Sequence, residues 1–201
     1  MRGQPAKVLG GGEVRRLLSA ARRRRYPDRN TVIVMLSVKA GLRACEIARL
    51  TWPMVTDARG YIGTVIELPS KAAKKGSGRR IPIHPGLHRA LVKLRRQSFE
   101  DSDDAPETPR SDAIVQSERG GPMTAKAVVD WFTGIFAELG LQGCSSHSGR
   151  RTFVTRAARL IQKAGGSLRD VQQLVGHQSI KTTQGYIDGD HDAQRRLIRM
   201  L

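Results

Sequence analysis

The segment 31–41, TVIVMLSVKAG, is apolar on nearly all of its sides. A segment of this kind is stable as a helix only where neighbouring elements cover it all round. Asn30 or Thr31 is suited to cap its start, and Gly41 is suited to end it. The chain therefore needs a fold that is built around one buried helix.

The rest of the chain supplies amphipathic helices that can cover such a core. Between Thr124, a capping residue, and Gly140, apolar residues recur with the 3.6-residue period of a helix. Ser167 and Asp170 form an S-x-x-D capping box, and Gly176 is suited to end the helix that follows. These signals predict a mostly helical domain.

Strand signals are confined to short segments. The runs YIGTVIELP (61–69) and RRIPIHP (79–85) are rich in β-branched residues or alternate, and a basic turn, SKAAKKGSG (70–78), separates them. A further short strand is expected at AIVQS (113–117). The expected fold class is therefore α+β, with many helices and a small antiparallel β-sheet or hairpin.

Charge indicates the kind of partner. The sequence has 35 Lys and Arg against 18 Asp and Glu, a net charge of +17. Such an excess destabilises a compact chain by self-repulsion unless a polyanion relieves it, and nucleic acid is the expected polyanion. The segment 100–112 is instead acidic, so we expect it to form an outer loop away from DNA.

Bulk features exclude other classes of protein. No stretch approaches the roughly 20 apolar residues of a membrane span, and the N-terminus lacks the apolar core of a signal peptide. Cys45 and Cys144 lack the paired spacing of a zinc site. We expect a protein of the bacterial cytoplasm, associated with the nucleoid when in use, without a bound metal or other cofactor.

A series of motifs carries the functional signal. In chain order these are GLR with a following acid (41–46), RRIP (79–82), HSGR (147–150), LVGH (174–177) and a tyrosine, Tyr186, nine residues after the last histidine. Each motif is weak alone, because an arginine on a helix or a tyrosine on a surface is usually structural. Their order and spacing together give the signal its specificity.

From about Val8 to its end the chain resembles the catalytic domain of the tyrosine recombinase, or phage integrase, family. The resemblance implies a site-specific DNA recombinase, carried by a phage or other mobile element or acting as a chromosomal switch. Such an enzyme cleaves and rejoins strands through a 3′-phosphotyrosyl intermediate, without metal or ATP. It implies these catalytic residues: Arg43, Lys74, His147, Arg150, His177 and the nucleophile Tyr186. Glu46 takes a supporting position.

The basic turn leaves the catalytic lysine open. Lys71, Lys74 and Lys75 all lie on it, and counting back from Pro82 favours Lys74. The other two turn lysines, together with Arg79 and Arg151, are expected to contact DNA.

The roles follow from the charge of a phosphodiester. Two permanently charged guanidinium groups can hold its non-bridging oxygens through fixed N–H donors, as a metal ion does elsewhere. A tyrosine, with a pKa near 10, needs a proton acceptor, for which His147 is the best candidate. His177 can donate a hydrogen bond to the phosphate, and a lysine can protonate the leaving 5′ oxygen.

The expected domain organisation is a disordered segment 1–7 and a catalytic domain 8–201, with a C-terminal tail at 188–201. Because only about seven residues precede the resemblance, we expect a minimal member without the family's usual N-terminal DNA-binding domain, or else a truncated chain or gene remnant. The resemblance implies double-stranded DNA as partner, a homotetramer on DNA and accessory DNA-binding proteins. The apolar side of the tail can dock on a neighbouring protomer or on its own domain.

Three other functions remain open at this point. A non-catalytic DNA-binding module would bind DNA without forming a covalent adduct. A type IB topoisomerase would relax supercoiled DNA without sequence preference. A metal-dependent nuclease using His147 and His177 would lose activity in EDTA.

Overall fold

The structure, a computed structural model, describes residues 6–73, 76–100, 112–186 and 198–199. Most of segment 1–7, the acidic loop and the C-terminal tail lie outside these residues. The elements in chain order are α1 (Gly11–Arg23), α2 (Pro27–Lys39), α3 (Ala44–Ala48), η1 (Trp52–Met54), β1 (Val65–Leu68), β2 (Arg79–Pro82), α4 (Pro85–Glu100), α5 (Ala125–Glu138), α6 (Ser148–Leu160), η3 (Gln162–Ala164), α7 (Leu168–Val175) and α8 (Ile180–Gln184). This confirms the predicted α+β class. No helix within the described ranges is long and apolar enough to cross a membrane.

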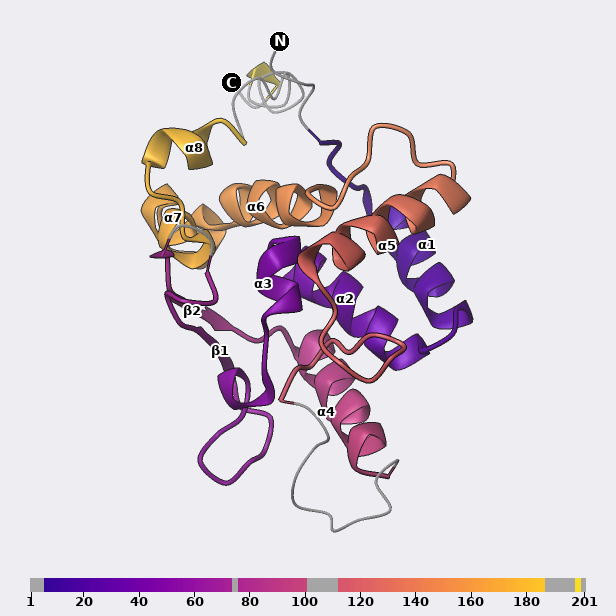
Figure 1. Cartoon of the computed structure of the whole chain (residues 1–201). Helices are drawn as coiled ribbons and strands as arrows, with labels where there is room; N and C mark the ends of the chain where they lie inside the picture. The colour runs from indigo at the N-terminus through magenta and orange to yellow at the C-terminus, as the bar shows by residue number, and fades with distance from the viewer. Residues whose placement is uncertain (1–5, 74–75, 101–111, 187–197, 200–201) are drawn as a thin grey trace.

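Helix α2 is the buried centre that the sequence predicted. Residues 30–38 are all buried, and α1, α3, α4 and α6 pack against the helix (Figure 1). The predicted cap was wrong, because the helix begins one turn earlier at Pro27. Proline has no backbone N–H and is therefore suited to the first turn, where N–H groups lack a partner within the helix. Asn30 lies inside the helix instead. Its amide donates to the carbonyl of Arg25 (2.7 Å) in the connection and to that of Ala21 (3.4 Å) in α1, which joins α1 to α2.

The predicted hairpin is present as an antiparallel pair. Strands β1 and β2 run in register from Val65 opposite Pro82 to Leu68 opposite Arg79. The strand expected at 113–117 was wrong: within the described residues this segment makes only isolated bridges, at Ala113 and at Gln116. Its backbone bonds to Leu50 on one side and Met123 on the other, so no single strand partners it along its length.

At α5 and α7 the helix boundaries follow the predicted caps. The Thr124 hydroxyl accepts a hydrogen bond from the Ala127 amide (3.1 Å) at the start of α5. The Ser167–Asp170 capping box opens α7, and Gly176, with a φ of 64°, ends it in the left-handed conformation.

Two hydrophobic clusters hold the molecule together. The larger one surrounds α2, and the smaller consists of Val154, Val171 and Val175, with Tyr186 packed against it. Helix α6 lies between them and meets α2 through small residues. A Cβ added at Gly149 of α6 would overlap the Ser37 hydroxyl and lie 2.9 Å from the Ser37 Cβ. The two helices therefore approach too closely for any larger side chain.

We expect Gly149→Ala to destabilise the protein by about 1–3 kcal/mol, the usual cost of overpacking. Gly134 offers a matched control, since it lies in the interior of α5 with open space where its Cβ would stand. Gly134→Ala is expected to stabilise by about 0.5–1 kcal/mol through helix propensity. Urea denaturation measures both, and equal effects in the two variants would contradict the close packing.

Candidate active site

Segments far apart in sequence bring five charged or polar groups together. Arg43 precedes α3, Arg79 lies on β2, Arg150 on α6, and His177 follows α7. Glu46 of α3 is hydrogen bonded to the first two of these, and the others interact with them electrostatically. The result is a cluster of positive charge around one buried carboxylate.

Arg150 is held by two backbone carbonyls. Its side chain is 2% exposed, with Nη1 donating to the Gly41 carbonyl (2.6 Å) and Nη2 to the Val175 carbonyl (2.7 Å). Gly41 has a φ of 64°. A Cβ at this position would overlap Cδ1 of the Phe153 ring and lie 3.0 Å from its Cε1. A glycine is therefore required where the chain turns to accept this bond. A guanidinium has five N–H donors, so further donors remain for an anion.

The electrostatics of Arg150 favour an anion. Burial, and then the charges of Arg43 and Arg79, lower its pKa to about 10, while Glu46 and Tyr186 act in the opposite direction. The group is still charged at neutral pH. Because its charge is only partly balanced, a phosphate oxygen at this position would be stabilised.

Glu46 holds Arg43 through two atoms. The carboxylate is completely buried and accepts the Arg43 backbone N–H at Oε2 and Nη1 at Oε1, both at 2.9 Å. Burial acts to raise its pKa, but the hydrogen bond and charge of Arg79, followed by those of Arg43, bring the pKa to about 2. Glu46 is therefore ionised at any pH at which the protein works.

Tyr186 lies beside His177. The two rings stack with centroids 5.5 Å apart and an interplanar angle of 23°. His177 Nδ1 is 2.9 Å from the Thr183 hydroxyl, and the Arg151 guanidinium lies 5.6 Å from the centroid of the Tyr186 ring. The predicted nucleophile thus lies against the histidine of its own chain and interacts electrostatically with Arg150.

His177 is neutral at pH 7. Its side chain is buried, and this desolvation, then the charges of Arg150, Arg43 and Arg79, lower its pKa to about 4. A neutral imidazole has one N–H donor. If the Thr183 hydroxyl donates to Nδ1, that donor is at Nε2.

We expect His177 to make stability depend on pH. Its pKa is 6.5 when unfolded and about 4 when folded, so the folded state resists protonation. Its contribution is complete above pH 6.5 and is lost as the pH falls toward 4, which amounts to roughly 3 kcal/mol. Unfolding free energies of the wild type and His177→Asn, measured in urea across this interval, should therefore converge as the pH falls. A constant difference would contradict the shifted pKa.

The other predicted residues are placed as follows. His147 is exposed at the N-terminus of α6, one turn before Arg150. Lys71 is exposed on the turn after β1. Lys74 and Lys75 lie outside the described residues, so the choice of catalytic lysine stays a prediction.

Arg79 has contacts that the sequence analysis missed. Its side chain is only 4% exposed and pairs with Glu46 rather than facing solvent. Strand alternation carried the signal, because Arg79 stands two residues before buried Ile81 and so shares its inward face.

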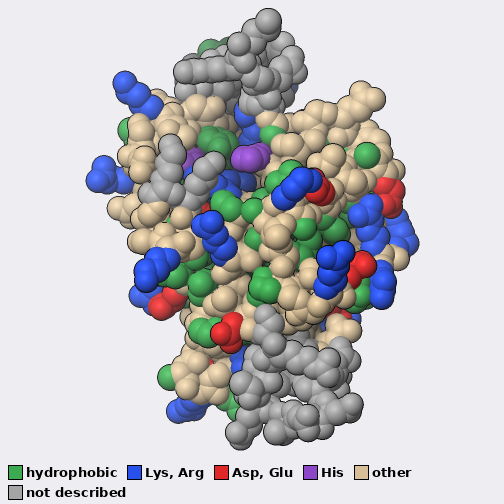
Figure 2. All heavy atoms as spheres, viewed as in Figure 1, with side chains coloured by type: hydrophobic (Ala, Val, Ile, Leu, Met, Phe, Trp, Pro, Cys, Tyr) green, Lys and Arg blue, Asp and Glu red, His purple; other side chains and the backbone are tan. Residues whose placement is uncertain are grey.

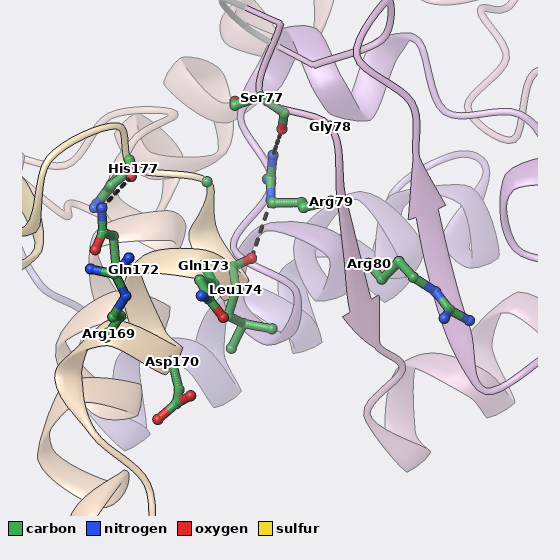
Figure 3. Close-up of a pocket in the computed structure, with 11 residues that line it drawn as sticks. Ser77, Gly78, Arg79, Arg80, Arg169, Asp170, Gln172, Gln173, Leu174 and His177 are labelled. Atoms are coloured by element: carbon green, nitrogen blue, oxygen red, sulfur yellow. Dashed lines mark hydrogen bonds between the residues drawn. The ribbon is translucent and has the colours of Figure 1, made fainter.

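A hollow of about 590 Å³ adjoins the site between β2 and α7. Figure 3 shows Arg79 and His177 on its walls with Arg169 and Asp170 of α7, whereas the Arg80 side chain points away from Arg79 and His177. Figure 2 shows histidine side chains next to Lys and Arg atoms in the upper part of one face. The Arg79 and His177 side chains of the site thus adjoin a hollow lined mostly by polar and basic residues.

Comparisons of the sequence with known proteins all indicate the same family. The sequence pattern of the Phage integrase family matches residues 7–192. Tyrosine recombinase XerC of Brucella suis is 28% identical over 190 residues, which cover 92% of this chain and 55% of that protein. Tyrosine recombinase XerA of Pyrococcus furiosus is 27% identical, over 90% of this chain and 56% of its own. The chain thus spans about half the length of these relatives.

Solved structures share the fold. A crystal structure of XerA recombinase matches 98% of this chain and 66% of its own, with a TM-score of 0.74 and 23% identity. A lambda integrase tetramer bound to a Holliday junction matches 92% of this chain and 49% of its own, with a TM-score of 0.67 and 18% identity. The chain belongs to the phage integrase family.

Proposed function

We propose that this protein is a site-specific DNA recombinase that cleaves and rejoins strands through a 3′-phosphotyrosyl intermediate, without metal or ATP. The observation that carries the proposal is the position of Tyr186. Its ring stacks on His177 and lies within electrostatic reach of Arg150, which has donors left for a phosphate. Family membership and the names of the curated relatives support the same reaction.

In the proposed reaction, the Tyr186 oxygen attacks the scissile phosphorus as the bond to the 5′ oxygen breaks. Arg43 and Arg150 hold the non-bridging oxygens and offset the charge that grows there. The phenol proton passes to His147, and Lys74 supplies a proton to the departing 5′ oxygen. Neutral His177 donates one hydrogen bond to the phosphate.

The phosphotyrosyl bond retains the energy of the phosphodiester. A 5′-hydroxyl from another strand can therefore attack it, which releases Tyr186 and reforms a continuous strand. This exchange explains why the reaction needs no ATP. It also explains why a protein nucleophile, and not water, suits recombination.

The proposed partner is double-stranded DNA, bound by a homotetramer. The net charge of +17 favours a polyanion, and the lambda integrase neighbour is described as a tetramer on a Holliday junction. Lys71, Lys75 and Arg151 are proposed to contact the DNA backbone within a catalytic domain of residues 8–201. Accessory DNA-binding proteins are proposed as further partners.

A nicked suicide duplex tests the proposal. Its sequence is taken from the DNA that flanks the gene, and the nick lets the short fragment after the cleaved phosphate diffuse away. We expect an SDS-resistant protein–DNA adduct, formed in EDTA, with the DNA on the peptide that contains Tyr186. Binding without an adduct would indicate a DNA-binding module, and loss of activity in EDTA a nuclease. Relaxation of plasmids irrespective of sequence would indicate a topoisomerase.

A further inference from the structure

We propose that Arg79 is a positioning residue for this reaction: it fixes Glu46 and the end of α7, and thereby sets Arg43 and His177 around the phosphate without contacting DNA itself. The inference rests on the proposed function, and it assigns Arg79 a different role from the DNA contact that its place beside the basic turn had predicted.

Arg79 has few N–H donors left for DNA, because most of them bond to the protein itself. Nη1 and Nη2 donate to Glu46 Oε1 (3.1 Å) and Oε2 (2.9 Å), a paired geometry that only a guanidinium provides. Nε donates to the Leu174 carbonyl (3.2 Å), and Nη1 also reaches the Ser77 carbonyl (3.4 Å) (Figure 3). Four of the five N–H donors thus have protein acceptors.

Arg79 also joins three elements of the fold. It belongs to β2, bonds to Glu46 of α3, and bonds to the last turn of α7. The final carbonyls of a helix lack partners within the helix, and a cation there is favoured by the helix dipole. The carbonyl of Leu174 is held by Arg79 and that of Val175 by Arg150.

The Arg79 side chain closely approaches Gly176, the residue before His177. A Cβ at Gly176 would lie 3.1 Å from Arg79 Cδ and 3.2 Å from Nη1. The Arg79 side chain therefore lies directly against the turn that orients His177. Moving this side chain would displace both the histidine and the carboxylate that holds Arg43.

The neighbouring arginine supplies a contrast. Arg80 points away from the core on the same strand, is 75% exposed, and pairs with exposed Glu67, its one ion pair among the residues that the structure describes. A general loss of positive charge or of strand stability would affect both positions alike. A positioning role belongs to Arg79 alone, so Arg80→Gln is the matched control for Arg79→Gln.

Cleavage and binding are measured separately on the suicide duplex. For Arg79→Gln we expect the rate of adduct formation at saturating protein to fall about 100-fold, the effect of a small misplacement of catalytic groups. The Kd for intact duplex and its salt dependence should stay as in the wild type. A direct phosphate contact would instead lower the salt slope by about one and leave the saturated rate unchanged. Arg80→Gln should cleave at the wild-type rate.

A double-mutant cycle tests whether Arg79 acts through Glu46. If it does, Arg79→Gln in a Glu46→Gln background should lower the rate by much less than 100-fold, because the pair is already broken and only the contact with the end of α7 is left to lose. Full additivity of the two losses would overturn the proposal. Arg79→Lys, which keeps the charge but not the paired geometry, guards against a variant that fails to fold and should still be slower than the wild type.

A measurement without DNA separates this inference from the proposed function. The groups that face Glu46 are Arg43, Arg79 and Arg150, with His177 and Tyr186 next to them. We expect the carboxyl carbon of Glu46, followed by NMR, to titrate at higher pH in Arg79→Gln than in the wild type. An unchanged titration would refute the role of Arg79 even if cleavage is observed. A shifted titration in a protein that forms no adduct would refute the recombinase and leave the Arg79–Glu46 pair established.

Discussion

Replacing Tyr186 with phenylalanine is expected to abolish the covalent adduct. The loss should be on the order of 10⁶-fold in rate, which is the cost of removing a nucleophile in other covalent enzymes. Phenylalanine keeps the ring that packs against Val154, Val171 and Val175 and stacks on His177. The fold and the Kd for DNA should therefore be unchanged, and a gel of the suicide reaction measures the difference.

Tyr61 provides the matched control for this substitution. It is 71% exposed, and its Tyr61→Phe variant should form adduct at the wild-type rate. An adduct that survives in Tyr186→Phe would assign the nucleophile to another residue. Mixing the Tyr186→Phe variant with wild type also shows whether a subunit cleaves with its own tyrosine, as the position of Tyr186 beside His177 in one chain leads us to expect.

The second large effect is expected at Arg150. In Arg150→Lys, a single ammonium replaces the planar group that bonds to the Gly41 and Val175 carbonyls and has donors left for the phosphate. We expect cleavage to slow by about 10³-fold or more, as when a transition-state arginine is lost in other phosphoryl-transfer enzymes. Each carbonyl left without a donor should also cost roughly 1–3 kcal/mol of stability.

The exposed arginine at the other end of the same helix is the control. Arg159→Lys should leave both the cleavage rate and the urea midpoint unchanged. The prediction for Arg150 separates its two roles, because stability is measured without DNA. If Arg150→Lys were destabilised but cleaved normally after correction for the folded fraction, Arg150 would be structural only.

Much of the fold could be predicted because the signals were local. The apolar run in α2, the Thr124 cap and the Ser167–Asp170 capping box each depend on residues within a few positions of one another. The two failures have different causes. Segment 113–117 bonds to Leu50, which lies far away in the sequence, whereas the start of α2 at Pro27 is itself a local signal that the prediction of a cap at Asn30 or Thr31 overlooked.

For the candidate site, the sequence predicted residues that lie together in the structure but not the contacts between them. The motif order pointed to Arg43, Arg150 and His177, and the structure brings these three together. Strand alternation indicates that Arg79, two residues before buried Ile81, is the one of the two adjacent arginines that faces inward. It does not indicate the partner, because the pairing with Glu46, 33 positions earlier, exists only after the hairpin packs on α3 and α7.

The separation into two hydrophobic clusters has a consequence for control of the reaction. Arg43 and Glu46 are carried by the half of the molecule around α2, whereas Tyr186 rests on the three valines of the other half. In the proposed reaction, the groups that meet around one phosphate are thus carried by two separate hydrophobic clusters, and the hydrogen bonds of Arg79 and Arg150 between them set their alignment. A small shift of α7 or α8 relative to α2 would therefore change the cleavage rate while the packing around α2 stays as it is.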